Sequence, residues 1–228
     1  MTQDPFGILV VDKEKGMTSH DVVELVRRRF GIKKVGHAGT LDPNATGVLV
    51  LLLGRATKLS AKFSAEEKEY RASMKLGEKT DSGDCEGSII STRGVTSTQE
   101  EIKEVFRRFL GETEQTPPMV SAKRVGGRRL YKLARKGIEV ERKPQKIVIK
   151  KLEVESVDLP LVRFQVVCSK GTYIRQLAED IGESLGCGAH LVELERVRSG
   201  DFSSCGALSV SRLKEMDKET FNESIIRI

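Results

Sequence analysis

A glycine-rich stretch followed directly by an apolar run stands near the start of the chain, where residues 36–53 read GHAGTLDPNATGVLVLLL. Its glycines allow backbone conformations that a side chain would exclude, and Pro43 fixes its own φ and favours an extended Asp42. The run 48–53 has the length and composition of a buried strand. We therefore predict that Asp42 lies on a shaped loop, outside any helix or strand, that is anchored to the hydrophobic core.

Two interpretations of this loop are open. An aspartate before a proline commonly opens a turn, so Asp42 could be purely structural. Catalytic side chains are also held on loops that a rigid core positions. The local sequence favours the two interpretations about equally.

The rest of the chain shows strand and helix signals that do not alternate strictly. The sequence predicts strands at residues 7–11, 48–53, 70–76, 147–157, 161–168 and 189–197. It predicts helices at residues 18–30, from a capping box at 97–100 through 110, at 172–185, and in a tail from 211. This order favours an α+β fold with a mixed, largely antiparallel central sheet and flanking helices.

Composition excludes several classes of protein. Of the 228 residues, 38% are apolar and 32% charged, as in a globular protein, and no apolar run approaches the roughly 20 residues of a membrane helix. The first six residues lack the features of a signal peptide, so we expect a cytoplasmic protein. The four cysteines form no C-x-x-C pair and are expected to be reduced thiols rather than metal ligands.

Positive charge is concentrated in one segment. Residues 117–151 hold 12 lysines and arginines against two glutamates, although the net charge of the whole chain is only +6. Such a segment is typical of a surface that binds a polyanion, but it could also be a solvated helix face. Apolar and basic residues alternate at helical intervals here, which predicts a packed helix with a cationic flank formed by Arg128, Lys132, Arg135 and Lys136.

Common catalytic motifs are absent from the sequence. There is no Walker loop, no G-x-G-x-x-G after a strand, no H-E-x-x-H and no acidic cluster of metal ligands. One carboxylate on a loop remains as the candidate catalytic group, and a carboxylate can act as a covalent nucleophile or stabilise a developing sugar cation.

Five blocks of sequence, in order between residues 7 and 202, resemble the bacterial tRNA pseudouridine-55 synthases, the TruB-like family. They occupy residues 36–49, 68–87, 115–137, 169–182 and 188–202. The family's catalytic aspartate corresponds to Asp42. The chain departs from the family at Ala38, where threonine is more usual, and at Glu195, where a second arginine is usual.

The resemblance implies the pseudouridine synthase fold, with an active-site cleft across the sheet and a basic segment at about 117–151 that reaches over RNA. It implies a catalytic domain at 1–210. Residues 211–228 are expected to be a short tail, with no separate C-terminal RNA-binding domain, because only 26 residues follow Phe202.

The implied activity is isomerisation of a uridine to pseudouridine, in the T-loop of tRNA at position 55, after the nucleotide has been flipped out. No cofactor, metal or protein partner is implied. Two alternatives remain open: a guide-RNA-dependent synthase of a ribonucleoprotein, and a non-catalytic tRNA-folding chaperone.

Site residues follow from the matching motifs. Arg175 corresponds to the arginine that pairs with the aspartate, although it could instead form a surface ion pair with Glu179. Tyr70 corresponds to the aromatic that stacks on the target base, although its strand pattern also suits a core residue. The other implied contacts are His37 in the vacated stack, Tyr173 and Leu194 in the base pocket, and Arg128, Arg129, Lys132 and Lys136 on the RNA backbone.

Overall fold

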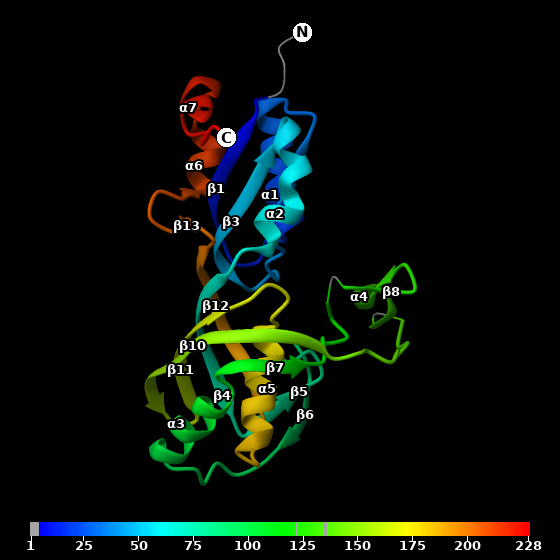
Figure 1. Ribbon diagram of the computed structural model, residues 1–228, viewed down its shortest axis with the longest axis vertical. Coiled ribbons are helices and arrows are strands. Elements are labelled where there is room, and N and C mark those ends of the chain that lie inside the picture. Colours follow the sequence, from blue (N-terminus) through cyan, green and yellow to red (C-terminus); the bar gives the residue numbers. More distant parts are fainter. Residues whose placement is uncertain (1–4, 122, 135) are drawn as a thin grey trace. The chain divides into compact units, whose positions relative to one another are not determined.

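The computed structural model describes residues 5–121, 123–134 and 136–228 and divides into two compact units (Figure 1). The first unit consists of Met1–Tyr70 and Leu194–Ile228, and the second of Arg71–Glu193. Two strands, β4 (Lys68–Leu76) and β12 (Ala189–Ser199), contribute residues to both units. The first unit is therefore assembled from segments far apart in the sequence.

The first unit has a mixed sheet. Strands β1 (Gly7–Lys13) and β2 (Val35–His37) run antiparallel to β3 (Thr46–Leu53), whereas β12 runs parallel to β3. Two short strands extend it, β13 (Phe202–Ser203) beside β12 and β14 (Leu208–Ser209) beside β1. Its helices are α1 (Ser19–Phe30), the 3-10 helix η1 (Gly54–Leu59), α2 (Ser60–Ala65), α6 (Val210–Glu215) and α7 (Lys218–Glu223).

Helix α1 shows both expected end signals. Thr18 caps its start through a capping box with Asp21, and Gly31 ends it in the left-handed conformation at φ 68°. The stretch expected to be a short tail, residues 211–228, contains α7 and all of α6 except its first residue, and both helices belong to this unit. Phe221 of α7 stacks on Phe30 of α1 with ring centroids 3.7 Å apart.

Strand β3 forms the centre of the first hydrophobic core, because every residue from Gly47 to Leu53 is buried. Val48, Val50 and Leu52 pack with Ile8 and Ala38. The loop that carries Asp42 enters β3 directly, so the prediction of a core-anchored loop is confirmed.

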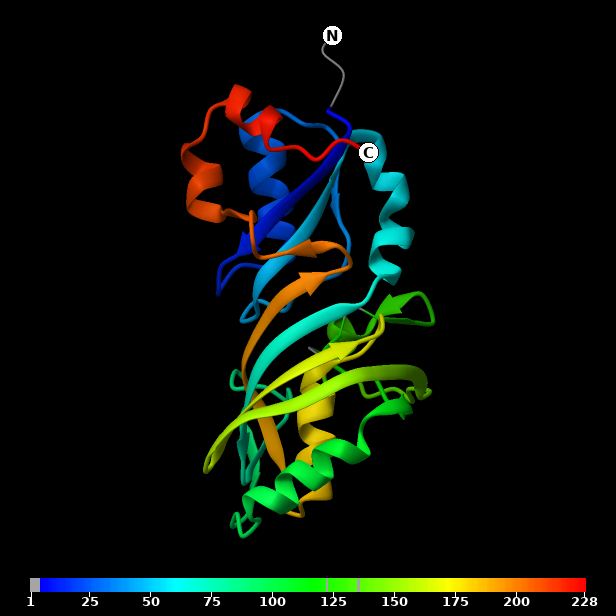
Figure 2. The same ribbon diagram turned by 60° about the vertical axis from the view of Figure 1, so that its left-hand side comes forward.

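Within the second unit, the strand order is β12, β4, β11, β10, β7, with β12 and β4 represented by those of their residues that belong to this unit. Strands β10 (Gln145–Asp158) and β11 (Leu161–Cys168) form a long antiparallel hairpin, and β7 (Gly111–Gln115) pairs with β10. Helices α3 (Gln99–Arg108) and α5 (Ile174–Ser184) lie against one another beside this hairpin (Figure 2). The remaining elements are β5 (Glu78–Thr80), β6 (Ile89–Thr92), β8 (Arg124–Val125), β9 (Arg128–Arg129) and α4 (Leu130–Ala134).

Several predicted boundaries were wrong. His37 belongs to strand β2 rather than to the loop, because β3 offers backbone partners as far as Leu51. The second capping box joins Thr98 to Glu101, one residue later than predicted, and α3 ends at Arg108. Helix α5 starts at Ile174, since Tyr173 is its extended N-cap residue.

The basic helix predicted around residues 128–136 is shorter in the structure. Arg128 and Arg129 belong to the β8–β9 hairpin, whose turn is made by two glycines at positive φ. Only Leu130–Ala134 is helical, with Leu130 and Leu133 buried. Arg135 lies outside the described residues.

The α+β class, with a mixed sheet and flanking helices, is confirmed. Across the described parts of the chain, none of the helices has the length and apolar character needed to cross a membrane.

Candidate active site

The Asp42 loop, defined here as residues 38–48, runs in the first unit from the end of β2 into β3 and includes the first three residues of that strand. Ala38, Leu41 and Ala45 are buried and anchor it, whereas Asp42 is half-buried. The Ala45 amide donates to the Asp42 carbonyl at 3.1 Å, so the chain turns directly after the aspartate. The carboxylate therefore has partial access to solvent on a backbone that is fixed on either side.

Two buried polar side chains hold the middle of the loop. The Ser19 hydroxyl accepts from the Leu41 amide at 2.8 Å and donates to the Leu41 carbonyl at 3.1 Å. Lys13 Nζ donates to the Pro43 carbonyl at 3.0 Å, and also to the carbonyls of Glu14 and Met17. Both residues that flank Asp42 are thus fixed through their backbone.

A third buried side chain reaches the two ends of the loop. Arg196 of β12 donates from Nε to the Val48 carbonyl at 2.7 Å and from Nη2 to the Gly39 carbonyl at 3.1 Å. Only 1% of Arg196 is exposed. The neighbouring Glu195 is half-exposed, and side chains alternate along a strand, so the family departure at Glu195 leaves the buried face of β12 unaltered.

Lys13 has an unusual electrostatic environment. Its pKa is lowered to about 8, chiefly because the side chain is buried; the nearby charge of Asp42 opposes this shift, that of Arg196 adds to it, and that of Asp21 opposes it. The Asp42 carboxylate therefore lies in a region that also holds two buried cationic side chains.

Three other predicted site residues belong to the first unit. Tyr70 is 8% exposed on β4, and Leu194 is half-buried on β12. His37 is half-buried at the end of β2, where it pairs with Leu51. Next to Tyr70, Glu69 forms an ion pair with Arg198 of β12, at 3.0 Å between Oε2 and Nε.

Arg175 and Tyr173 belong to the second unit. Arg175 is 4% exposed, so its side chain does not lie on the surface. Its Nη1 donates to the Ser82 carbonyl at 2.9 Å, its Nη2 to the Val120 carbonyl at 2.7 Å, and its Nε lies 3.6 Å from Asp84 Oδ2. The guanidinium is thus oriented by residues from two of the other family-like blocks.

The backbone of Tyr173 is held by Gln115. The Gln115 side chain accepts from the Tyr173 amide at 2.8 Å and donates to its carbonyl at 3.1 Å. Gln115 is buried, so this pair fixes the start of α5, the helix that carries Arg175.

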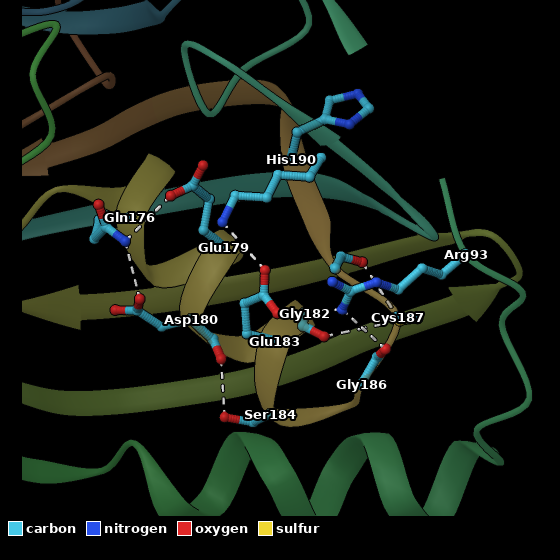
Figure 3. Close-up of polar contacts among 12 residues, drawn as sticks. Arg93, Gln176, Glu179, Asp180, Gly182, Glu183, Ser184, Gly186, Cys187 and His190 are labelled. Carbon is cyan, nitrogen blue, oxygen red and sulfur yellow. Dashed lines mark hydrogen bonds and ion pairs between the residues drawn. The ribbon is translucent and has the colours of Figure 1, made fainter. Parts of the chain in front are cut away.

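The C-terminal end of α5 is held by hydrogen bonds and ion pairs of charged side chains (Figure 3). Glu183 accepts from Lys79 at 3.1 Å and from Arg93 at 3.4 Å. Burial raises the pKa of Glu179 and of Asp180, both of which accept from Gln176. Together with the Arg175 contacts, this network fixes α5 along its length.

The basic segment, residues 117–151, exposes Arg128, Lys132 and Lys136. The backbone of Arg129 lies in β9. Three other basic side chains of the segment have contacts within the protein: Lys123 with Gln145, Arg142 with the Pro117 carbonyl, and Lys151 with Gln165 and Glu153. Within the described residues, no group of three or more His, Cys, Asp or Glu side chains is arranged to hold a metal ion.

Sequence reasoning missed the side chains that act on backbone. Ser19 and Lys13 lie before the first family-like block, and nothing local distinguishes them from a helix-start serine and a strand-end lysine. Arg196 and Gln115 lie inside the blocks, as do Ser82 and Asp84, which contact the Arg175 guanidinium, so their position there was the available signal.

The chain is similar to known proteins over most of its length. The chain matches the model of the TruB family pseudouridylate synthase N-terminal domain over residues 27–174 and that of the tRNA pseudouridylate synthase B C-terminal domain over residues 175–227. The tRNA pseudouridine synthase B of Protochlamydia amoebophila is 54% identical, over 86% of this chain and 75% of its own length. That of Syntrophotalea carbinolica is 49% identical, over 97% of this chain and 73% of its own length.

Among solved structures, a crystal structure of a Cbf5-Nop10-Gar1 complex contains a chain that is 31% identical, with a TM-score of 0.75. The match covers 97% of this chain but only 60% of that one. Fold and sequence thus agree on the class, the pseudouridylate synthases. Within that class, the chain belongs to the TruB family.

Proposed function

We propose that this protein isomerises a uridine of tRNA to pseudouridine, the activity after which its relatives are named. The observation that carries the proposal is the Asp42 loop, which presents a half-buried carboxylate on a backbone held by three buried side chains. A loop fixed in this way suits a carboxylate that must meet a sugar in one orientation.

The residue roles follow the family resemblance. Asp42 is the catalytic carboxylate, and Arg175 is the arginine that pairs with it. Tyr70 stacks on the flipped base and Tyr173 and Leu194 line its pocket, while His37 fills the position that the base has left. Breaking and remaking a glycosidic bond needs no redox step, so the reaction proceeds without a cofactor.

We infer that residues 1–210 act as one catalytic module and that 211–228 complete its first unit. The target within tRNA is the T-loop uridine at position 55, recognised by shape, stacking and phosphate contacts. Exposed cations of the basic segment, Arg128, Lys132 and Lys136, supply phosphate contacts, together with Arg129.

A guide-RNA-dependent reaction is the second candidate, because the chain resembles one in a structure described as an H/ACA RNP bound to a substrate RNA containing 2'-deoxyuridine, at 28% identity and a TM-score of 0.72. A single assay separates the two. The purified chain is incubated with an unmodified tRNA transcript, without guide RNA or other protein, and pseudouridine is mapped by position. Formation at the T-loop supports the proposal, whereas formation only when guide RNA and partner proteins are added supports the second candidate.

The same assay tests the catalytic carboxylate. Asp42→Asn keeps the shape of the side chain and removes its charge, so pseudouridine formation should fall by at least about 1,000-fold while tRNA binding survives. Asp201→Asn is the matched control, because Asp201 is an exposed aspartate of the same unit. Parental turnover in Asp42→Asn would contradict the role of Asp42. A tRNA-folding chaperone would form no pseudouridine in either protein.

A further inference from the structure

Arg196 is among the largest fully buried side chains of the protein, and none of the roles proposed for the reaction belongs to it. A buried guanidinium is costly unless its donors are satisfied. Its Nε and Nη2 both donate to backbone carbonyls of the Asp42 loop, at Val48 and Gly39. The cost of burying this charge is thus offset by contacts with the loop that carries the aspartate.

The two carbonyls lie on either side of Asp42, three residues before it and six residues after it. Ser19 and Lys13 hold only Leu41 and Pro43, in the middle of the loop. Arg196 therefore links the two ends of the loop, because it bonds Gly39 near the start and Val48, in strand β3, at the end. The planar fork of arginine suits this task, because two of its nitrogens can donate in different directions while the group stays rigid.

The backbone of Arg196 adds a second constraint. It pairs in register with Gly47 in the parallel β12–β3 ladder. A Cβ atom at Gly47 would lie 2.3 Å from the Arg196 carbonyl oxygen, and Gly47 has φ +93°. Only glycine allows β12 to approach so closely, and this approach brings the guanidinium within reach of Gly39 and Val48.

We propose that Arg196 is a positioning residue for the reaction, one that holds Asp42 in its reactive orientation through the Gly39 and Val48 carbonyls. The inference rests on the proposed function of Asp42. Arg196 acts on the backbone and makes no contact with RNA in this role, so its loss should lower kcat and leave KM nearly unchanged.

The test compares Arg196→Lys with Arg198→Lys. Arg198 lies on the same strand and, like Arg196, makes two side-chain hydrogen bonds. These go to the Glu69 carboxylate and the Gly200 carbonyl rather than to the Asp42 loop, and its side chain is 33% exposed. In Arg196→Lys the charge is kept, while a single amino group replaces the fork. We expect kcat for pseudouridine formation to fall on the order of 100-fold, because small displacements of a catalytic group have effects of this size. KM and tRNA affinity should stay within about twofold, and Arg198→Lys should keep parental kcat.

A readout independent of activity is hydrogen exchange at two amides of the loop, Leu41 and Ala45, which are bonded to Ser19 and to Asp42. Both should exchange faster in Arg196→Lys than in Arg198→Lys, with amides of β10 and β11 unchanged in both. Arg196→Met removes both hydrogen bonds to the loop and should increase exchange at the same two amides. If the methionine variant does not fold, the comparison of Arg196→Lys with Arg198→Lys still tests the proposal.

Parental kcat in Arg196→Lys, an equal loss in Arg198→Lys, or a loss that appears only in KM would overturn the proposal. So would unchanged exchange at Leu41 and Ala45. If the parental protein forms no pseudouridine, the proposed function fails, and the exchange data still show whether Arg196 fixes the loop.

Discussion

Lys13 is a fully buried side chain that carries an amino group able to ionise. Its amino group donates to three carbonyls, so the charged form is satisfied by hydrogen bonds, yet burial lowers its pKa to about 8 from an ordinary 10.5. Between these two values the unfolded chain holds a proton that the folded protein has released. Stability contributed by this position must therefore rise with pH in that window.

We predict this rise from a comparison with Lys13→Met. The free energy of unfolding of the parental protein, minus that of the variant, should increase by about 2 kcal/mol between pH 8 and pH 10 and should be flat below pH 7. Urea unfolding at each pH measures it. Lys15→Met, at an exposed position two residues away, should show no such trend. A flat difference across the whole range would mean that Lys13 keeps an ordinary pKa.

Tyr70 allows its two proposed contributions to be separated. Tyr70→Phe keeps the stacking surface and loses only the hydroxyl, whereas Tyr70→Leu loses both. We expect the leucine variant to lose a further 1–3 kcal/mol of transition-state stabilisation, roughly the value of one base–aromatic stack, measured as kcat/KM on tRNA. Phe63→Leu, which alters an aromatic that packs against the core of the same unit, should change stability but not kcat/KM. Equal activity in the parental protein and both Tyr70 variants would assign Tyr70 to core packing.

At the scale of elements, α5 positions Arg175 and carries carboxylates with opposite pH behaviour. Burial raises the pKa of Asp180. The ionised carboxylate therefore lowers the stability of the fold at pH values above this pKa, and this destabilisation disappears in acid, where Asp180 is protonated in both the folded and the unfolded protein. The hydrogen bond from Lys79 lowers the pKa of Glu183, so this carboxylate stabilises the fold at neutral pH and loses its effect as pH falls below 4.5.

Two variants test this contrast. Asp180→Asn should be more stable than the parental protein at pH 7 and equal to it at pH 3, whereas Glu183→Gln should be less stable at pH 7 and should also converge in acid. Thermal or urea unfolding at both pH values measures these differences. The same sign of change in both variants at pH 7 would contradict the assignment of burial and ion pairing as the two causes.

The basic segment is the element that should set the salt dependence of tRNA binding. Replacing Arg128, Arg129, Lys132 and Lys136 by glutamine removes up to four cations that neutralise phosphates, and should reduce the slope of log K against log salt by roughly 0.7 per phosphate left without its cation. Because these side chains are not proposed to touch the target base, saturating tRNA should restore most of the turnover. Glutamine at three exposed cations of α3 is the matched control and should leave the slope unchanged: Lys103, Arg107 and Arg108. An unchanged slope in the first variant would mean that the segment is a solvated face.

At the scale of the whole molecule, the sequence predicted what depends on local pattern. Helix α1, the β10–β11 hairpin and buried β3 follow from end signals and periodicity that neighbouring residues carry. The contacts that hold the Asp42 loop could not be predicted in this way, because their partners lie far apart in the sequence. Arg196 is 157 residues from Gly39, and a charged residue on an alternating strand is ordinarily expected to face solvent.

The first unit is discontinuous, with its two segments separated by the whole second unit. Ribosomes add residues from the amino end, so Asp42, Ser19 and Lys13 all emerge well before Arg196 exists. A nascent chain that has reached the end of α5 already contains every proposed catalytic side chain, yet the ends of its aspartate loop lack their guanidinium contacts. The Asp42 loop can therefore reach its final structure only after β12 has been synthesised. A polypeptide released before that point would contain the proposed catalytic residues but would lack the Arg196 contacts that hold the loop.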